Sequence, residues 1–251
     1  MHALASGAAD PRRFLLRRLH SLCGVLPIGV FLVVHLWTNL HAIRGRGAFR
    51  HAVEDIQSIP GLGVIEFVAI LAPLAFHAIY GLVIAAQSRF NVHRYSYTRN
   101  WMFVLQRVTG LIAVAFLVVH LGQFRAAKLF GTLRWEAFYD ALALLIGSPG
   151  MFVLYVLGVT ASVFHFANGL WSASQTWGVA ASDRARRRTA VACIVLGLTL
   201  WLAGVDTLLH FFYRCGGVFP WPGMDRDALC RDADMLRAIM AAPLYFSGPT
   251  T

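Results

Sequence analysis

Four histidines occupy matched positions in two copies of a repeat. His35 and His120 each end the pentapeptide Phe-Leu-Val-Val-His, while His77 and His165 are each the second residue of the frame Phe-His-x-x-x-Gly-Leu-x-x-Ala-x-Gln. The two copies lie about 85 to 88 residues apart, and all four histidines fall within apolar stretches. Ionisable residues inside a membrane are costly to keep without a function, and imidazole is a common axial ligand of haem iron. We therefore interpret the four histidines as axial ligands of two b-type haems.

The segments that must carry these histidines are long and apolar. Of the 251 residues, 58% are hydrophobic and 14% are charged, whereas roughly a quarter of a soluble domain is charged. A membrane-spanning helix needs about 20 mainly apolar residues, and five stretches qualify, at about 22–42, 63–87, 103–124, 151–177 and 190–213. We expect an all-α membrane protein, with a five-helix transmembrane bundle over residues 1–213 holding two haems in its core, and a C-terminal tail over 214–251.

The distribution of basic residues predicts the orientation. The net charge is +10, but the arginines cluster in the segments between spans rather than forming a face for nucleic acid. The segments that are cytoplasmic when the N-terminus is inside carry more arginines than the two short outer loops, as the positive-inside rule requires. We expect a cytoplasmic N-terminus and a C-terminus outside. Cys215 and Cys230 would then lie in an oxidising compartment, where they could form a disulfide.

Depth within the spans sorts the histidines into two layers. At 1.5 Å of rise per residue, His35 and His120 lie about 8 and 6 Å from the outer edge of their spans. His77 and His165 lie about 20 Å in from the outside. Histidines at one depth on different helices can hold an iron from both sides, and an iron ligated twice by imidazole has no open site for a substrate. The sequence therefore predicts electron transfer between the two membrane faces.

Further motifs accompany the histidines: RRLHSL at 17–22, YSY at 95–97, RNWMFVLQRVTG at 99–110 and FHFANGLW at 164–171. In these motifs, and over roughly residues 14–213, the chain resembles the dihaem cytochrome b subunit, of the cytochrome b558 type, that anchors bacterial succinate:quinone oxidoreductases in the membrane. The resemblance implies that His77 and His165 bind the inner haem and that His35 and His120 bind the outer haem.

The resemblance also implies partners and a location. A flavoprotein subunit would oxidise succinate, and an iron–sulfur subunit would pass its electrons to this chain, with both subunits docked on the cytoplasmic face of the bacterial inner membrane. The outer haem would then reduce a quinone, expected to be menaquinone. The chain would act as the electron-transfer and quinone-reducing subunit, surrounded by lipid, and would bind no succinate itself.

Glu66 is a candidate for proton transfer to the quinone. Quinone reduction takes up protons, so a titratable group is needed near the outer haem. Glu66 lies near the outer start of the second span, and a glutamate occurs at the matching place in the family. The alternative is a solvated carboxylate that the helix dipole favours at a helix N-terminus.

Polar residues near the inner face are candidates for binding the haem propionates. His20, Ser21, Trp101 and Arg107 lie at the expected depth, and the fixed fork of donors on arginine suits a carboxylate. The alternatives are positive-inside anchoring for Arg107 and an interfacial polar role for His20. In span five, Asp206 and His210 form a further polar pair whose role stays open.

One position departs from part of the family. Fumarate-reducing relatives with a transmembrane proton path carry a glutamate two residues before the fourth-span histidine, where this chain has Val163. This favours succinate oxidation. Two other classes remain open at this point: a cytochrome b that anchors a hydrogenase or formate dehydrogenase, and a haem-free multi-pass transporter whose histidines relay protons.

Overall fold

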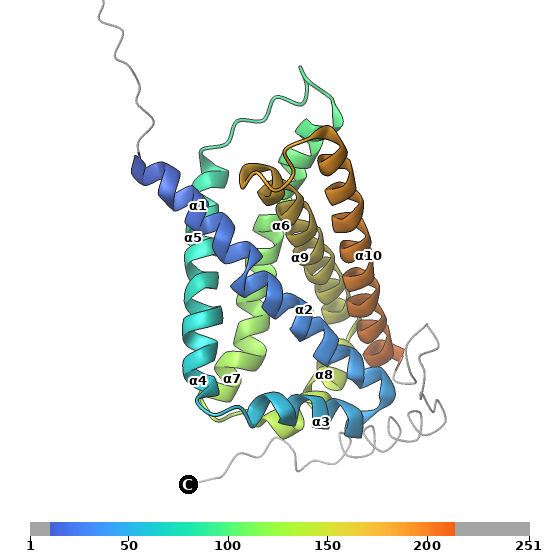
Figure 1. Ribbon diagram of the computed structural model, residues 1–251. Helices are drawn as coiled ribbons and strands as arrows, with labels where there is room; N and C mark the ends of the chain where they lie inside the picture. Colours follow the sequence, from blue (N-terminus) through green and yellow to red (C-terminus); the bar gives the residue numbers. More distant parts are fainter. Residues whose placement is uncertain (1–10, 214–251) are drawn as a thin grey trace, which may run out of the picture.

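The computed structural model describes residues 11–213, and over that range the chain is entirely helical (Figure 1). Its longer helices form an upright bundle, and short helices lie across one end. The α-helices are α1 (Pro11–Val25), α2 (Pro27–Leu40), α3 (Arg46–Gln57), α4 (Leu62–Ile65), α5 (Ala72–Ala86), α6 (Thr98–Leu121), α7 (Ala127–Leu129), α8 (Phe138–Ile146), α9 (Pro149–Thr176) and α10 (Asp183–Tyr213). Cys215 and Cys230, like the rest of the expected tail, lie outside the described residues.

Five continuous helical stretches within the described range are long and apolar enough to cross a membrane. They are Pro11–Arg44, Leu62–Ala86, Thr98–Leu129, Pro149–Thr176 and Asp183–Tyr213. Large apolar side chains such as Val118 and Val195 are more than half exposed, which suits a surface in contact with lipid rather than water. The predicted all-α bundle of five spans is confirmed.

The first span is bent where α1 meets α2. Pro27 cannot donate a backbone hydrogen bond and its ring crowds the preceding turn, so a proline inside a helix kinks it. The hydrogen-bonded path continues through the bend, from Leu26 N–H to the Leu22 carbonyl and from Val30 N–H to the Leu26 carbonyl. The bent helix crosses the bundle diagonally in Figure 1. It therefore contacts α5 along α1 and α10 along α2.

Of the remaining spans, α9 packs between α6 and α10, whereas α5 contacts α1 and α6. Near one end of the bundle, α3 and α8 contribute Phe49, Tyr139 and Ile146 to a buried cluster with Tyr155 and Phe211. This is the lower end of Figure 1, where α3 lies across the bundle. The segments that contain α3 and α8, which the sequence predicts to lie outside, are thus packed against the spans.

An ion pair links α3 to α8 across this end. Arg46 Nη2 lies 2.7 Å from Asp140 Oδ1, and Arg46 Nη1 donates to Asp140 Oδ2 at 2.9 Å. Partial burial raises the pKa of the Asp140 carboxyl, and the Arg46 guanidinium opposes that rise. Bidentate contacts of this kind fix the relative orientation of two elements, so the pair helps to hold α8 against the bundle.

Candidate functional site

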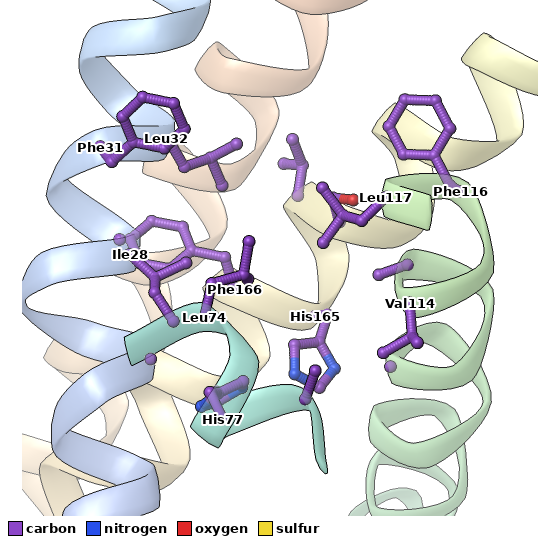
Figure 2. A pocket seen from close by; sticks show the side chains of 18 of the residues that line it. Ile28, Phe31, Leu32, Leu74, His77, Val114, Phe116, Leu117, His165 and Phe166 are labelled. Carbon is purple, nitrogen blue, oxygen red and sulfur yellow. The ribbon is translucent and has the colours of Figure 1, made fainter. Parts of the chain in front are cut away.

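The bundle brings the four histidines together in two pairs. The ring centroids of His35 and His120 lie 5.8 Å apart, at an interplanar angle of 75°. Those of His77 and His165 lie 6.1 Å apart, at 85°. Figure 2 shows the second pair, with His77 carried by α5 and His165 by α9. The structure thus brings together the histidines that the sequence places at the same depth. Two metal–nitrogen bonds of about 2 Å each would account for most of either separation.

The inner pair is oriented by backbone carbonyls. His77 Nδ1 lies 2.9 Å from the carbonyl oxygen of His20, and His165 Nδ1 lies 2.9 Å from that of Gln106. A carbonyl can only accept, so in both rings Nδ1 carries the proton and Nε2 carries the lone pair. Metal-binding histidines are typically held in this way, with the second ring nitrogen donating to a carbonyl. Both rings are thus prepared to bind a metal through Nε2.

The contacts of the inner pair repeat along the sequence. His20 lies 15 residues before His35 and Gln106 lies 14 residues before His120, and each offers its carbonyl to the second-frame histidine of its own copy. The side chains differ, however. The His20 ring stacks on His77 at a centroid distance of 4.1 Å, whereas the Gln106 side chain donates to the His165 carbonyl and accepts from Asn168. The two inner histidines therefore make the same backbone contact but are surrounded by different side chains.

The outer pair is held by side chains instead. His120 Nδ1 lies 3.3 Å from the hydroxyl of Tyr155, and that hydroxyl donates to Gln123 Oε1 at 2.6 Å. The Tyr155 oxygen therefore accepts from His120, which again leaves Nε2 with the lone pair. Phe31 stacks on His35 and Phe116 stacks on His120, with centroids 5.2 and 5.5 Å apart. These phenylalanines come from the same position of the repeated pentapeptide.

All four histidines line one continuous cavity of about 930 Å³. Ligand pockets in proteins usually measure roughly 300–1,000 Å³, so this cavity lies near the upper end of the range. Between the two pairs its walls are mostly apolar, with Ile28, Leu74 and Phe166 among the side chains drawn in Figure 2. The space suits large, flat, mainly apolar groups held by the imidazoles.

Glycines allow the inner histidines to lie directly on neighbouring helices. A Cβ at Gly24 would stand 2.5 Å from His77 Cε1, and a Cβ at Gly110 would stand 2.9 Å from His165 Cε1. Both distances are shorter than real Cβ contacts. The glycines that follow the inner histidines by one turn face other neighbours, because a Cβ at Gly81 would stand 3.1 Å from His20 Nε2 and a Cβ at Gly169 would stand 3.1 Å from Gln106 Nε2.

The inner end of the cavity is basic. Arg17, Arg99 and Arg107 line it together with His20 and Ser21. The four predicted propionate-binding residues do not all line this cavity. His20, Ser21 and Arg107 reach the cavity, whereas Trp101 is 46% exposed and is absent from its lining. A propionate contact at Trp101 therefore gains no support, since its helix turns the side chain outward. Trp177 donates to the Ser21 hydroxyl instead.

The outer end of the cavity is polar and holds two cations and one carboxylate. Arg125 Nη2 lies 3.1 Å from Glu66 Oε2, and Lys128 Nζ donates to Gln57 Oε1. All four side chains line the cavity. The predicted proton-transfer residue, Glu66, is thus brought to the same cavity as the histidines, at the end nearer His35 and His120.

The second polar pair lies elsewhere. His210 Nε2 is 3.0 Å from the Tyr139 hydroxyl, and His210 and Asp206 are both 1% exposed. Neither lines the cavity. His210 joins α10 to α8, and the structure does not bring the pair to the histidines.

The chemistry of the side chains that line this cavity fits haem. Two imidazole pairs line a shared, mostly apolar cavity, and hydrogen bonds at Nδ1 leave Nε2 of His77, His165 and His120 with the lone pair. Glycines make room where the inner rings meet helices, and one end of the cavity offers guanidinium groups to carboxylates. Imidazole is a common axial ligand of haem iron. A five-span bundle with this site has the features of a membrane-bound b-type cytochrome.

Comparison with known proteins identifies the family. A family described as the succinate dehydrogenase/fumarate reductase transmembrane subunit matches residues 85–204. The chain is 40% identical over 200 residues to the succinate dehydrogenase cytochrome b558 subunit of Bacillus subtilis (strain 168), and the match covers 80% of this chain and 98% of that protein. The chain belongs to the family of transmembrane subunits of succinate dehydrogenase and fumarate reductase. The predicted resemblance is confirmed, and an anchor of a hydrogenase or a haem-free transporter is no longer needed as an explanation.

Several residues of the site were not predicted. Gln106 and Asn168 stand inside motifs that were noted for their resemblance, but nothing in the sequence shows that they contact each other and His165. Tyr155 lies one helix away from the histidine that it contacts. Arg125 was expected in an outer loop, because the apolar stretch ends at residue 124. In the structure the helix continues past it to Leu129.

Proposed function

We propose that this chain is the dihaem cytochrome b anchor subunit of a succinate dehydrogenase, passing electrons from the cytoplasmic iron–sulfur subunit to a quinone at the outer side of the membrane. The observation that supports this most directly is the presence of two histidine pairs in one cavity, with Nδ1 of His77, His165 and His120 each held by a hydrogen bond. The printed name of the Bacillus subtilis relative, a cytochrome b558, supports haem b as the group.

In this proposal His77 and His165 hold the inner haem, and His35 and His120 hold the outer haem. Bound haem supplies one-electron chemistry, and six-coordinate iron leaves no position for a substrate. The chain's own contribution is to orient the imidazoles, to exclude water with an apolar wall, and to keep both pairs in one cavity. The inner arginines, with His20 and Ser21, would bind the propionates of the inner haem.

The quinone would bind at the outer end of the cavity. Glu66 lines that end and would give a proton to a quinone oxygen when the quinone is reduced, then take one back from the outer aqueous phase. We expect menaquinone as the substrate, because the resemblance points to enzymes that use it. The basic segments at the other end suit a cytoplasmic face, where the flavoprotein and iron–sulfur subunits would dock.

The number and pairing of the haems can be tested on the purified complex. A reduced-minus-oxidised spectrum with a haem-to-protein ratio should give two haems per chain. His35→Ala and His77→Ala should each remove one spectral component and leave the other. His51→Ala is the matched control, because its side chain is 84% exposed. A wild-type ratio of one or none, or a His35 variant that loses the same component as the His77 variant, would refute the proposal.

A further inference from the structure

An arginine faces the proposed proton donor at the outer end of the cavity. Arg125 Nη2 lies 3.1 Å from Glu66 Oε2, and the two side chains are only 28% and 20% exposed. The Nε of Arg125 is buried and has no hydrogen-bond partner among residues 11–213. A donor thus remains on a side chain that lines the cavity, as Glu66 does.

The backbone is locally rearranged where these two residues sit. Span two contains a π-helical turn at Glu66–Leu71, and span three contains one at Gly122–Ala126. A π-helical turn inserts an extra residue into the helix, re-aims the side chains that follow, and occurs frequently at functional sites. Glu66 opens the first of these turns and Arg125 lies in the second. Both spans therefore deviate from regular α-helix where the ion pair forms.

The charge at this end of the cavity distinguishes it from the other end. At the inner end Arg17, Arg99 and Arg107 line the cavity, and among the described lining residues Glu66, at the far end, is the one carboxylate. An anionic group therefore fits the inner end. At the outer end Glu66 compensates Arg125, and Lys128, bonded to the neutral Gln57, adds one further cation. A carboxylate bound beside Arg125 would still meet the Glu66 carboxylate. A neutral ligand with hydrogen-bonding oxygens fits the outer end better.

We infer that Arg125 is a binding residue of the quinone site. Its Nη2 holds the Glu66 carboxylate, and its Nε donates a hydrogen bond to a carbonyl oxygen of the quinone headgroup. This inference rests on the proposed function, which assigns proton transfer to Glu66. The inference adds Arg125 to the quinone site and explains the position of Glu66 by its contact with Arg125. Arginine suits both tasks because its donors are fixed in one plane.

The chemistry balances with the groups named. Reducing the quinone to the hydroquinone requires two electrons and two protons, and each C=O becomes C–O–H. The electrons come from succinate oxidation in the complex. As negative charge develops on the quinone oxygen, the fixed positive charge of Arg125 stabilises it. Glu66 takes up a proton from the outer aqueous phase and passes it to a quinone oxygen, and then does the same with the second proton. Arg125 itself gives up no proton.

Two substitutions at Arg125 separate its charge from its geometry. Arg125→Gln removes the charge, whereas Arg125→Lys keeps the charge and loses the planar donors. The matched control is Arg134→Gln, because Arg134 also pairs with a glutamate, Glu136 at 2.9 Å, but is 82% exposed and does not line the cavity. Each variant is assayed as the intact complex, with menadione, a soluble naphthoquinone, as the acceptor.

Arg125→Gln should raise both the KM and the calorimetric Kd for menadione by about tenfold, the effect expected for one charge-assisted hydrogen bond. Arg125→Lys should restore part of the loss, and Arg134→Gln should leave both constants unchanged. Succinate oxidation with a dye that accepts electrons from the iron–sulfur subunit should be unaffected, as should the haem spectrum. If Arg125→Gln does not assemble, the Kd of Arg125→Lys against that of Arg134→Gln decides the question.

Two results would overturn the inference. One is an unchanged menadione Kd in Arg125→Gln or, where that variant does not assemble, in Arg125→Lys. The other is loss of a haem component from the spectrum of the variant before any change in quinone affinity, which would assign Arg125 to the haem. The proposed function would be refuted by different results. These are a wild-type complex with fewer than two haems per chain, or a Glu66→Gln variant that reduces menadione at the wild-type rate.

Discussion

Gly24→Ala tests whether His77 keeps its position only because residue 24 has no side chain. A Cβ at Gly24 would stand 2.5 Å from His77 Cε1, and ordinary contact begins at 3.4 Å, so the His77 ring would have to retreat by about 0.9 Å. A shift of that size along the Nδ1 bond would stretch the 2.9 Å contact with the His20 carbonyl to about 3.8 Å, beyond hydrogen-bonding distance.

The free-energy cost follows from three effects. The lost hydrogen bond is worth about 1 kcal/mol, and overpacking a filled site costs about 1–3 kcal/mol. Replacing glycine by alanine inside a helix returns about 1 kcal/mol. The net cost is about 1–3 kcal/mol, which corresponds to a roughly 5- to 150-fold weaker hold on the group bound by His77. We expect the inner haem component to decrease while the outer component remains.

The assay is the reduced-minus-oxidised spectrum of the purified complex, with the haem-to-protein ratio measured as the detergent extract is diluted. Gly63→Ala is the matched control, because Gly63 is also helical and its Cβ would meet nothing within 4 Å. The reasoning is refuted if Gly24→Ala keeps both components at the wild-type ratio, or if it loses the outer component first.

Three further substitutions test other contacts. Arg46→Met leaves the Asp140 carboxyl partly buried without its cation and should lower stability by about 1–2 kcal/mol; because burial already raises the pKa of Asp140, the deficit in thermal unfolding temperature should grow as the pH rises above about 4. Asn168→Leu removes the donor to Gln106 Oε1 and should broaden or shift the inner haem band without changing the haem ratio. Arg107→Gln should lower the midpoint potential of the inner haem in a redox titration, by about 59 mV if the cation favours the reduced form tenfold.

The parts of the fold that depend on one helix at a time were predictable. Span number and position follow from apolar length, and the pairing of His35 with His120 follows from depth, since rise per residue is nearly constant along a helix. The repeats added an independent check, because equivalent residues in equivalent spans reach the same depth. None of this requires knowledge of how the helices pack.

What could not be predicted depends on rotation and on local backbone changes. Trp101 has the right depth but faces outward, and a glycine such as Gly24 looks the same in sequence whether it meets lipid or a ring. Arg125 was placed in a loop because hydropathy falls at residue 124, while a polar side chain that bonds across the bundle lets the helix continue. The direction that a π-helical turn gives to a side chain has no simple sequence pattern.

The repeated contacts bear on how such a bundle can arise. His35 meets its own counterpart His120, and His77 meets its counterpart His165. A residue that touches its own copy is the mark of an isologous interface, where a twofold axis relates two identical surfaces. A dimer of two-span hairpins would therefore already have both histidine pairs on its axis, and joining the two hairpins in one chain would need no new histidine. Once the halves were joined, positions 20 and 106 could change independently, so that the surroundings of His77 and of His165 could come to differ.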